Sequence, residues 1–447
     1  MSREEIIRAR DKSLAHLRSV FGDDSETVIA GERYGFISGL LKDTLKKPPT
    51  EAVTTSDKID RVLVHRVWGI PIFLGIMYGV FQFVFNAAAP LAYWIGVGFD
   101  RLAEVAGGVS PAWWSSLLGD GIIGGVGSVL SFVPNIFFLF IAIAILEDCG
   151  YLARAAFVMD RAMHKIGLHG RSFIPLMLGF GCTIPAVMAC RTIENPRDRI
   201  TTVLVSPFIA CGARLPIFVL LAGAFFAARA GLVVFAMYGI GIGIAIVTAL
   251  IFRKTLFRGP SGHFVMELPP YRLPTFTGVA VHMWERGRLF LRRAGTVIFA
   301  VVVVVWVLAS LPWGVAYASE ASALGHLGRA LAPVFAPCGF GQWPAAASLV
   351  FGFLAKETVV GSLGAIFAVE QGVLGGALSA HLGWTPLVAF AFMVFSLLYV
   401  PCVAAIGAIK SETNSWKWAW FSVAYTTGIA WTIATLIYQI GRLVVGG

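Results

Sequence analysis

The stretch GFGCTIPAVMAC, residues 179–190, interrupts an apolar segment that has basic residues at both ends. Arg171 precedes this segment, and three arginines follow it between residues 191 and 199. Basic residues beside apolar segments favour the cytoplasmic side of a membrane, so both ends are expected in the cytoplasm. A single crossing would put one end on the wrong side. The pattern therefore predicts a re-entrant hairpin of two half-helices that turns at Gly179 and Gly181.

The composition is that of a membrane protein. Of 447 residues, 57% are hydrophobic and only 13% are charged, whereas a soluble domain carries roughly 25% charged residues. Several windows reach the roughly 20 apolar residues that a crossing helix needs. The first 60 residues are polar, so we expect no cleavable signal peptide. The net charge of +10 is distributed over the ends of apolar segments and not gathered in one patch, so no nucleic-acid partner is predicted.

The distribution of basic residues predicts the topology of an all-α polytopic protein with its N-terminus in the cytoplasm. We expect about seven to eight transmembrane helices plus two re-entrant hairpins, with spans at about 67–88, 121–146, 200–227, 232–252, 294–311, 386–409 and 418–441. The expected organisation is a cytoplasmic helical segment (1–66), a first span with an outer interfacial segment (67–120), a first repeat (121–252), a basic cytoplasmic loop (253–293) and a second repeat (294–447).

A second interrupted apolar stretch provides the counterpart of the first. GFLAKET, residues 352–358, lies in a segment whose flanks are poor in Lys and Arg, so this hairpin is expected to enter from the outer face. In order along the chain, GFGCTIPAVMACRTI matches GFLAKETVVGSLGAI, and SPFIACGARLP (206–216) matches SLLYVPCVAAIG (396–407). Inverted repeats with paired interrupted segments are typical of transporters whose site lies near the midplane. The alternative is a structural bundle with ordinary kinked spans.

Three cysteines fall at these interruptions, namely Cys182, Cys211 and Cys402. Prolines near them free backbone carbonyls, and thiolates with carbonyl oxygens suit a transition-metal cation of intermediate softness. We also expect the carboxyl ends of half-helices to point at the site and add partial negative charge. The remaining cysteines are interpreted as packing residues: Cys149, Cys190 and Cys338.

The second hairpin carries two ionisable residues, Lys356 and Glu357. Ionisable groups at membrane depth are costly and usually functional. Glu357 is a candidate metal ligand or proton site, and Lys356 could neutralise it in the empty site; an adjacent pair that extends to a cavity is the alternative. Together with Gly179, Gly181 and Pro185 of the first hairpin, Lys356 is a candidate gating residue. Arg214 is interpreted as an anchor or gate.

Other residues point to no further site. Glu147 and Asp148 could collect cations but equally fit a solvated helix end, and the histidines at 263, 282, 326 and 381 have no ligand spacing. Neither a phosphate-binding loop GxxxxGK[ST] nor HExxH occurs in the sequence. We therefore expect no enzymatic activity and no permanently bound cofactor.

Five motifs give a resemblance to a known family: LEDCGYLARAAFVMDR, GFGCTIPAVMACRTIENPRDR, SPFIACGARLPIF, FVMELPPYRLP and LAKETVVGSLG. In the same order they resemble the membrane region of the bacterial ferrous-iron transporter FeoB family, from residue 31 to near the C-terminus. The resemblance implies import of Fe(II) across the inner membrane through two gate repeats similar to those of concentrative nucleoside carriers. It also implies that Cys182, Cys211 and Cys402 guide the ion.

The family normally begins with a GTP-binding domain, whereas residues 1–60 resemble only the end of its helical regulatory domain. The G protein is then a separate chain, absent from a stand-alone paralogue, or trimmed away. A separate G-protein subunit, a small accessory protein and a second copy of this chain are candidate partners beside the lipid bilayer.

The leading hypothesis is an Fe(II) permease, with other divalent transition metals as further candidate substrates. Two alternatives stay open at this point. One is a carrier of a nucleoside or another small organic solute on the same architecture, and the other is a non-transporting membrane anchor for a separate G protein.

Overall fold

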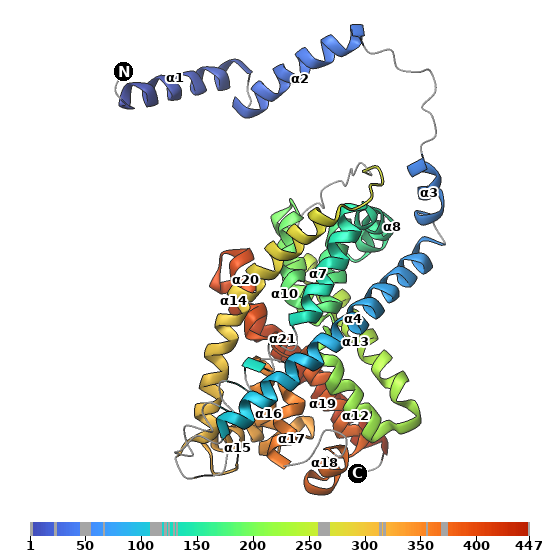
Figure 1. Cartoon of the computed structure of the whole chain (residues 1–447), viewed down its shortest axis with the longest axis vertical. Helices are drawn as coiled ribbons and strands as arrows, with labels where there is room; N and C mark the ends of the chain where they lie inside the picture. Colours follow the sequence, from blue (N-terminus) through green and yellow to red (C-terminus); the bar gives the residue numbers. More distant parts are fainter. Residues whose placement is uncertain are drawn as a thin grey trace. The chain divides into compact units, whose positions relative to one another are not determined.

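The computed structural model describes residues 3–21, 25–44, 55–65, 68–107, 133–257, 269–312, 319–354, 356–367 and 374–445, with the single positions 119, 123, 126, 127, 130 and 315. Every regular element within these ranges is a helix (Figure 1). The chain divides into two compact units, Met1–Lys58 and Ile59–Gly447. The expectation of an all-α polytopic membrane protein is confirmed.

The N-terminal unit is helical, as the sequence predicts for this polar segment. It contains α1 (Arg3–Phe21) and α2 (Ser25–Thr44), and the two helices contact each other. A short helix, α3 (Thr55–Leu63), spans the boundary between the units.

The second unit begins with a longer helix than expected. α4 runs from Gly69 to Gly107 and passes through Pro90, so residues 89–107, which the sequence assigns to an outer interfacial segment, continue the first span as one helix. Pro90 has no N–H for the helix ladder, and the helix accommodates it as membrane helices often do. The next span is described from α7 (Val133–Asp148), which bends by 79° into α8 (Tyr151–Lys165). The turn between them contains Gly150 at φ +79°, a conformation that favours glycine.

The first interrupted segment breaks where the sequence predicts. α9 (Phe173–Gly181) and α10 (Thr183–Ala189) contact each other and are separated by Cys182 alone. The chain continues through α11 (Pro196–Val205), a second break at residues 206–214, α12 (Leu215–Phe226) and α13 (Ala230–Thr255).

The second half of the unit begins with α14 (Phe276–Ser310), so the part of the expected basic loop from 276 to 293 is helix. Figure 1 shows α14 running from the region of α7 and α8 towards α15 (Ala323–Phe335). The second hairpin consists of α16 (Trp343–Leu354) and α17 (Thr358–Phe367), which contact each other. The last helices are α18 (Leu374–Leu382), α19 (Pro386–Leu398), α20 (Val403–Thr413) and α21 (Trp416–Val445).

Four helical stretches in the described ranges are long and apolar enough to cross a membrane: 69–106, 196–255, 386–413 and 416–444. The bent pair α7 and α8 adds a fifth if it counts as one span. This number is below the expected seven to eight, partly because the stretch 196–255 contains two expected spans, 200–227 and 232–252. In the stretch formed by α19 and α20, 72% of the most apolar window is buried inside the protein, against 18–22% in the other three stretches. The break between α19 and α20 therefore lies inside the unit.

Two glycine contacts have the same place in the two halves. A Cβ atom on Gly179 of α9 would lie 3.1 Å from Cβ of Ile209, and one on Gly352 of α16 would overlap the side chain of Tyr399. Gly179 matches Gly352 in the paired motifs, and Ile209 and Tyr399 both lie in the break that follows the hairpin. Each hairpin thus packs a glycine against the break that follows it in sequence, a correspondence expected of an internal repeat.

Candidate functional site

All three cysteines predicted to bind metal lie at the start of a helix. Cys182 is the N-cap residue of α10, Cys211 that of the short 3-10 turn Gly212–Arg214 before α12, and Cys402 that of α20. Cys182 and Cys211 have extended backbone conformations, and Cys402 has a φ of −58° and a ψ of 154°. None of the three side chains makes a capping hydrogen bond.

The breaks bring both kinds of helix end to the thiols. Cys182 follows the carboxyl end of α9, as the sequence predicts, and it also caps the amino end of α10, whereas Cys402 caps the amino end of α20. Carboxyl ends carry partial negative charge and amino ends partial positive charge, and an amino end favours an anionic sulfur.

The three cysteines and Glu357 converge from both halves of the unit. Cys182 is within electrostatic range of Cys211, Cys402 and Glu357. α10 and α16 both contact α20, and Cys182 and Cys402 pack against one apolar cluster. However, among the described residues no three His, Cys, Asp or Glu side chains are close enough together to hold a metal ion. A site of three such ligands would require the hairpin and the breaks to move closer together.

Among the described residues, no salt bridge joins Lys356 to its neighbour Glu357. Its side chain is 3% exposed, and Nζ donates a hydrogen bond to the carbonyl oxygen of Val400 at 2.7 Å. Nζ also lies 3.2 Å from the centroid of the Tyr399 ring. The ammonium group is thus held by the break between α19 and α20. Sequence analysis had not identified Tyr399 and Val400, although they directly precede Pro401.

Arg214 is an anchor in the first break. The side chain is 1% exposed, and Nη1 donates hydrogen bonds to the carbonyl oxygens of Pro207 at 3.0 Å and Ile209 at 3.1 Å. Both carbonyls belong to the break that contains Cys211, so the guanidinium group fixes the backbone next to this thiol. Nε of Arg214 is buried without a hydrogen-bond partner.

The remaining predicted hairpin residues lie at or near the breaks. Glu357 is half-buried in the turn between α16 and α17. Pro185 is buried in the first turn of α10, where a missing N–H costs the helix nothing. Gly181 ends α9, and a Cβ atom there would lie 2.6 Å from Cδ2 of Leu139.

Of the other cysteines, Cys149 and Cys190 contact carbonyls three and four residues earlier in the chain, whereas the thiol of Cys338 lies 3.2 Å from Oγ1 of Thr435 in α21. Cys190 and Cys338 are fully buried, and the thiol of Cys190 donates to the carbonyl of Ala186 at 3.4 Å. Cys149 donates to the carbonyl of Leu146 at 3.4 Å. Glu147 and Asp148 form the end of α7, with Glu147 exposed, as in the solvated helix end that the sequence allowed.

An ion-pair cluster that sequence analysis missed lies at the bend between α7 and α8. Arg154 of α8 is 1% exposed and donates to both carboxylate oxygens of Asp60, at 2.5 and 3.0 Å. The Tyr271 ring lies 3.7 Å from the guanidinium carbon, and its hydroxyl donates to Asp60 at 2.9 Å. Burial, and next the hydrogen bond to Asp60, raise the pKa of Tyr271. An arginine inside the apolar motif LEDCGYLARAAF was the available signal.

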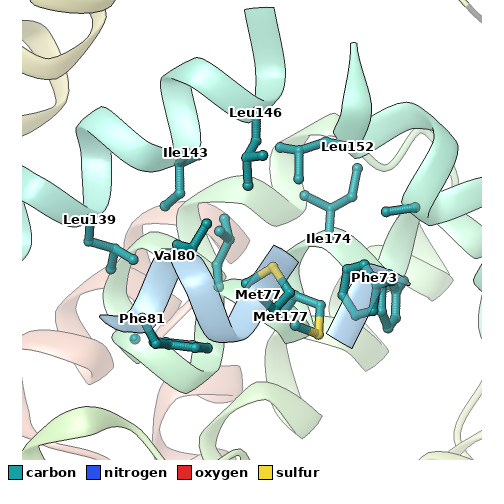
Figure 2. Close-up of a pocket in the computed structure, with 14 residues that line it drawn as sticks. Phe73, Met77, Val80, Phe81, Leu139, Ile143, Leu146, Leu152, Ile174 and Met177 are labelled. Atoms are coloured by element: carbon teal, nitrogen blue, oxygen red, sulfur yellow. The ribbon is translucent and has the colours of Figure 1, made fainter. Parts of the chain in front are cut away.

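A small apolar pocket adjoins the tip of the first hairpin. Its lining comes from α4, α7, α8 and α9 and includes Leu139 and Gly181. Figure 2 shows Met77 of α4 and Met177 of α9 side by side in this pocket. The pocket leaves space between α4 and the hairpin.

The chain is an all-α polytopic membrane protein in which an arrangement of hairpin and broken span occurs twice. This defines the class of membrane proteins with two gate repeats. Comparison with protein families agrees with this class. One family model, Gate, described as nucleoside recognition, matches both residues 129–225 and residues 291–416. Residues 234–286 match the C terminus of ferrous iron transport protein B, and residues 1–46 match the FeoB cytosolic helical domain.

The relatives name the family. The chain is 41% identical to the Fe(2+) transporter FeoB of Methanocaldococcus jannaschii, over 98% of this chain and 66% of the relative. It is 37% identical to that of Campylobacter jejuni, over 91% of this chain and 69% of the relative. A third relative, from Porphyromonas gingivalis, is a fusion of Fe(2+) transport protein A and FeoB, 40% identical over 98% of this chain and 58% of the relative. The chain belongs to the FeoB family.

The chain spans 58% and 66% of the length of the Porphyromonas and Methanocaldococcus proteins. No solved structure matches it.

Proposed function

We propose that this chain is an inner-membrane permease that imports Fe(II), with Cys182, Cys211 and Cys402 as successive or shared ligands and Glu357 as a further ligand. The observation that carries this proposal is the position of all three thiols at breaks of apolar segments. The relatives from Methanocaldococcus jannaschii and Campylobacter jejuni are named as Fe(2+) transporters. Thiolate, carboxylate and carbonyl ligands also suit Mn(II), Co(II) and Zn(II), which are proposed as secondary substrates.

The proposed transport step is a movement of the hairpins relative to the breaks. Because the four ligands do not form a metal cluster in the described structure, an arriving ion would draw the tip of α9 and α10 towards Cys402. Each hairpin would shift against the break on which its glycine packs, Gly179 on Ile209 and Gly352 on Tyr399. Alternating exposure would follow from the inverted orientation of the two repeats.

The test is Fe(II) uptake into proteoliposomes under anaerobic, reducing conditions. Cys182→Ser, Cys211→Ser and Cys402→Ser are each expected to reduce uptake at least tenfold, since a hydroxyl is a poorer ligand for a borderline cation than a thiolate. The matched control is Cys149→Ser. The thiol of Cys149 donates a hydrogen bond to the carbonyl of Leu146 in its own turn. This variant is expected to take up Fe(II) at the wild-type rate. Unchanged uptake in all three variants would disprove the ligand role.

The same vesicles separate the alternatives. A nucleoside carrier would accumulate labelled uridine or adenosine, whereas the iron permease would not. A membrane anchor for a G protein would transport neither solute. The Porphyromonas gingivalis fusion with Fe(2+) transport protein A makes a small accessory protein of that kind the first partner to add if uptake is slow.

A further inference from the structure

The break between α19 and α20 forms a cation-binding place that the chain itself occupies. Val400 lies in the non-helical stretch 399–402, so its carbonyl oxygen stands outside the helical ladder of α19 and α20. Beside it, the Tyr399 ring offers its negative face. The ammonium of Lys356 sits on both, at 2.7 Å from the oxygen and 3.2 Å from the ring centroid.

The carbonyl dipole of Val400 and the face of the Tyr399 ring compensate the charge of Lys356. Lys356 forms no salt bridge with any other described residue, and its side chain is 3% exposed. A desolvated cation without a carboxylate partner is costly to keep in place. A doubly charged ion that also binds the neighbouring thiol would be favoured at this position.

The first break holds its cation differently. Arg214 reaches carbonyls only five and seven residues before it in the chain, at Ile209 and Pro207, so it closes its own segment. Lys356 instead reaches across 44 residues, from the tip of the second hairpin to the break of the following span. Release of Lys356 would therefore separate two elements, whereas Arg214 fixes one. Of these two buried cations, Lys356 alone ties a hairpin to a thiol-bearing break.

We infer that Lys356 is a tethered competitor of the transported cation and a specificity-determining residue of the site. With no ion present, its ammonium holds the Val400 carbonyl and the Tyr399 ring. An entering divalent ion takes over the Val400 oxygen beside Cys402 and releases the hairpin tip. An alkali-metal ion, with one charge and little affinity for the thiol, cannot displace the ammonium. This inference rests on the proposed function and names the group that the substrate must displace.

Metal titration of the purified full-length chain in detergent tests the inference, with Co(II) as the probe because its thiolate complexes absorb visible and near-ultraviolet light. Lys356→Met keeps the stem and removes the charge, so it is expected to bind Co(II) at least tenfold more tightly than the wild type. The matched control is Lys410→Met, since Lys410 lies over the Trp416 ring at 5.8 Å, at the opposite end of α20 from Cys402. Its affinity is expected to be unchanged. Equal or weaker binding by Lys356→Met overturns the inference.

A measurement on the wild type covers the case in which Lys356→Met fails to fold. Labelling with an amine-reactive reagent, read out at Lys356 by mass spectrometry, is expected to increase at least fivefold when Co(II) is added. Labelling of Lys410 is expected to stay constant. If Lys356 labelling does not increase although the thiolate–Co(II) band appears, the inference fails and the proposed thiol site stands. If the wild type gives no such band, the proposed site fails and takes the inference with it.

Discussion

Asp60 and Arg154, 94 positions apart in the sequence, form a two-point ion pair in which the arginine is almost fully buried. The pair joins α3, directly beyond the N-terminal unit, to α8, directly beyond the 79° bend. α8 in turn contacts α9 of the first hairpin. The position of the hairpin therefore depends on an ion pair at the edge of the membrane region.

Asp60→Asn is expected to destabilise this region, because it leaves the charge of Arg154 buried without its counter-ion. Breaking a buried pair costs roughly 3–5 kcal/mol, and the 19% exposure of Asp60 reduces the expected loss to about 2–3 kcal/mol. Chemical denaturation in detergent measures it. The control is Glu194→Gln, which removes an exposed partner of Arg171 and should cost less than about 1 kcal/mol. Equal losses in the two variants would contradict the assigned role.

Gly352→Ala is expected to disturb the second break. The added methyl group would overlap the side chains of Val359 and Tyr399, and Tyr399 supports the ammonium of Lys356. Overpacking of this kind costs about 1–3 kcal/mol, and we expect Fe(II) uptake to fall along with the thermal stability. The control is Gly361→Ala in α17, where no atom lies within 4 Å of the new methyl group. A Gly352→Ala protein as stable and active as Gly361→Ala would show that the contact has no role.

Gly181 and Leu139 should be energetically coupled. Gly181→Ala places a methyl group 2.6 Å from Cδ2 of Leu139, at the wall of the apolar pocket. The single variant is expected to lose about 1–3 kcal/mol of stability, and Leu139→Ala about 2–5 kcal/mol. Because the second change makes room for the first, the double variant should lose less than the sum. A double-mutant cycle measures this difference, and strict additivity would refute the contact.

Gly223→Ala, an open position on α12, is the control for the effect of a methyl group on a helix. It is expected to change stability little, alone or together with Leu139→Ala.

We expect the protein to lose stability on acidification because of the environment of His169. Its Nδ1 accepts a hydrogen bond from the backbone N–H of Arg171, which requires the neutral ring. Burial, the largest cause, lowers the pKa of His169 below 6.5, with Arg171 and His164 acting in the same direction and Asp198 and Asp160 opposing it. The unfolded chain then binds the proton more readily than the folded chain. The stabilising contribution is present above pH 6.5 and is lost as the pH falls below it.

His169→Asn tests this pH dependence, because an amide oxygen can accept the same hydrogen bond without titrating. The difference in unfolding free energy between wild type and variant should be constant above pH 6.5. Below pH 6.5 the wild type should lose stability relative to the variant. A difference that does not vary with pH would rule out titration of His169 as the cause.

The breaks of the helices were predictable from the sequence, whereas their long-range partners were not. Glycine and proline around Cys182, Cys211 and Cys402 interrupt the helical pattern locally, and the structure breaks there. The basic segment expected at 253–293 includes the first part of α14, which begins at Phe276, because charge indicates the side of the membrane but does not prevent a helix.

The contacts of buried charges depend on tertiary structure. Lys356 reaches a carbonyl 44 positions away and Arg154 a carboxylate 94 positions away. The local periodicity of the sequence does not indicate which residues so far apart in the chain contact each other. For the same reason, sequence proximity suggested that Lys356 neutralises Glu357, but the ammonium instead lies on the α19–α20 break.

The 39 residues of α4 have a consequence for where the protein meets water. At 1.5 Å per residue the helix is roughly 58 Å long, whereas the hydrocarbon core is about 30 Å thick. Nearly half of its length must therefore lie outside the hydrocarbon unless it is strongly tilted. Asp100, Arg101 and Glu104 are grouped near its C-terminal end, where such a rod would stand clear of the lipid. A spin label placed at these positions should sense bulk water, and one near Met77 should sense acyl chains or protein.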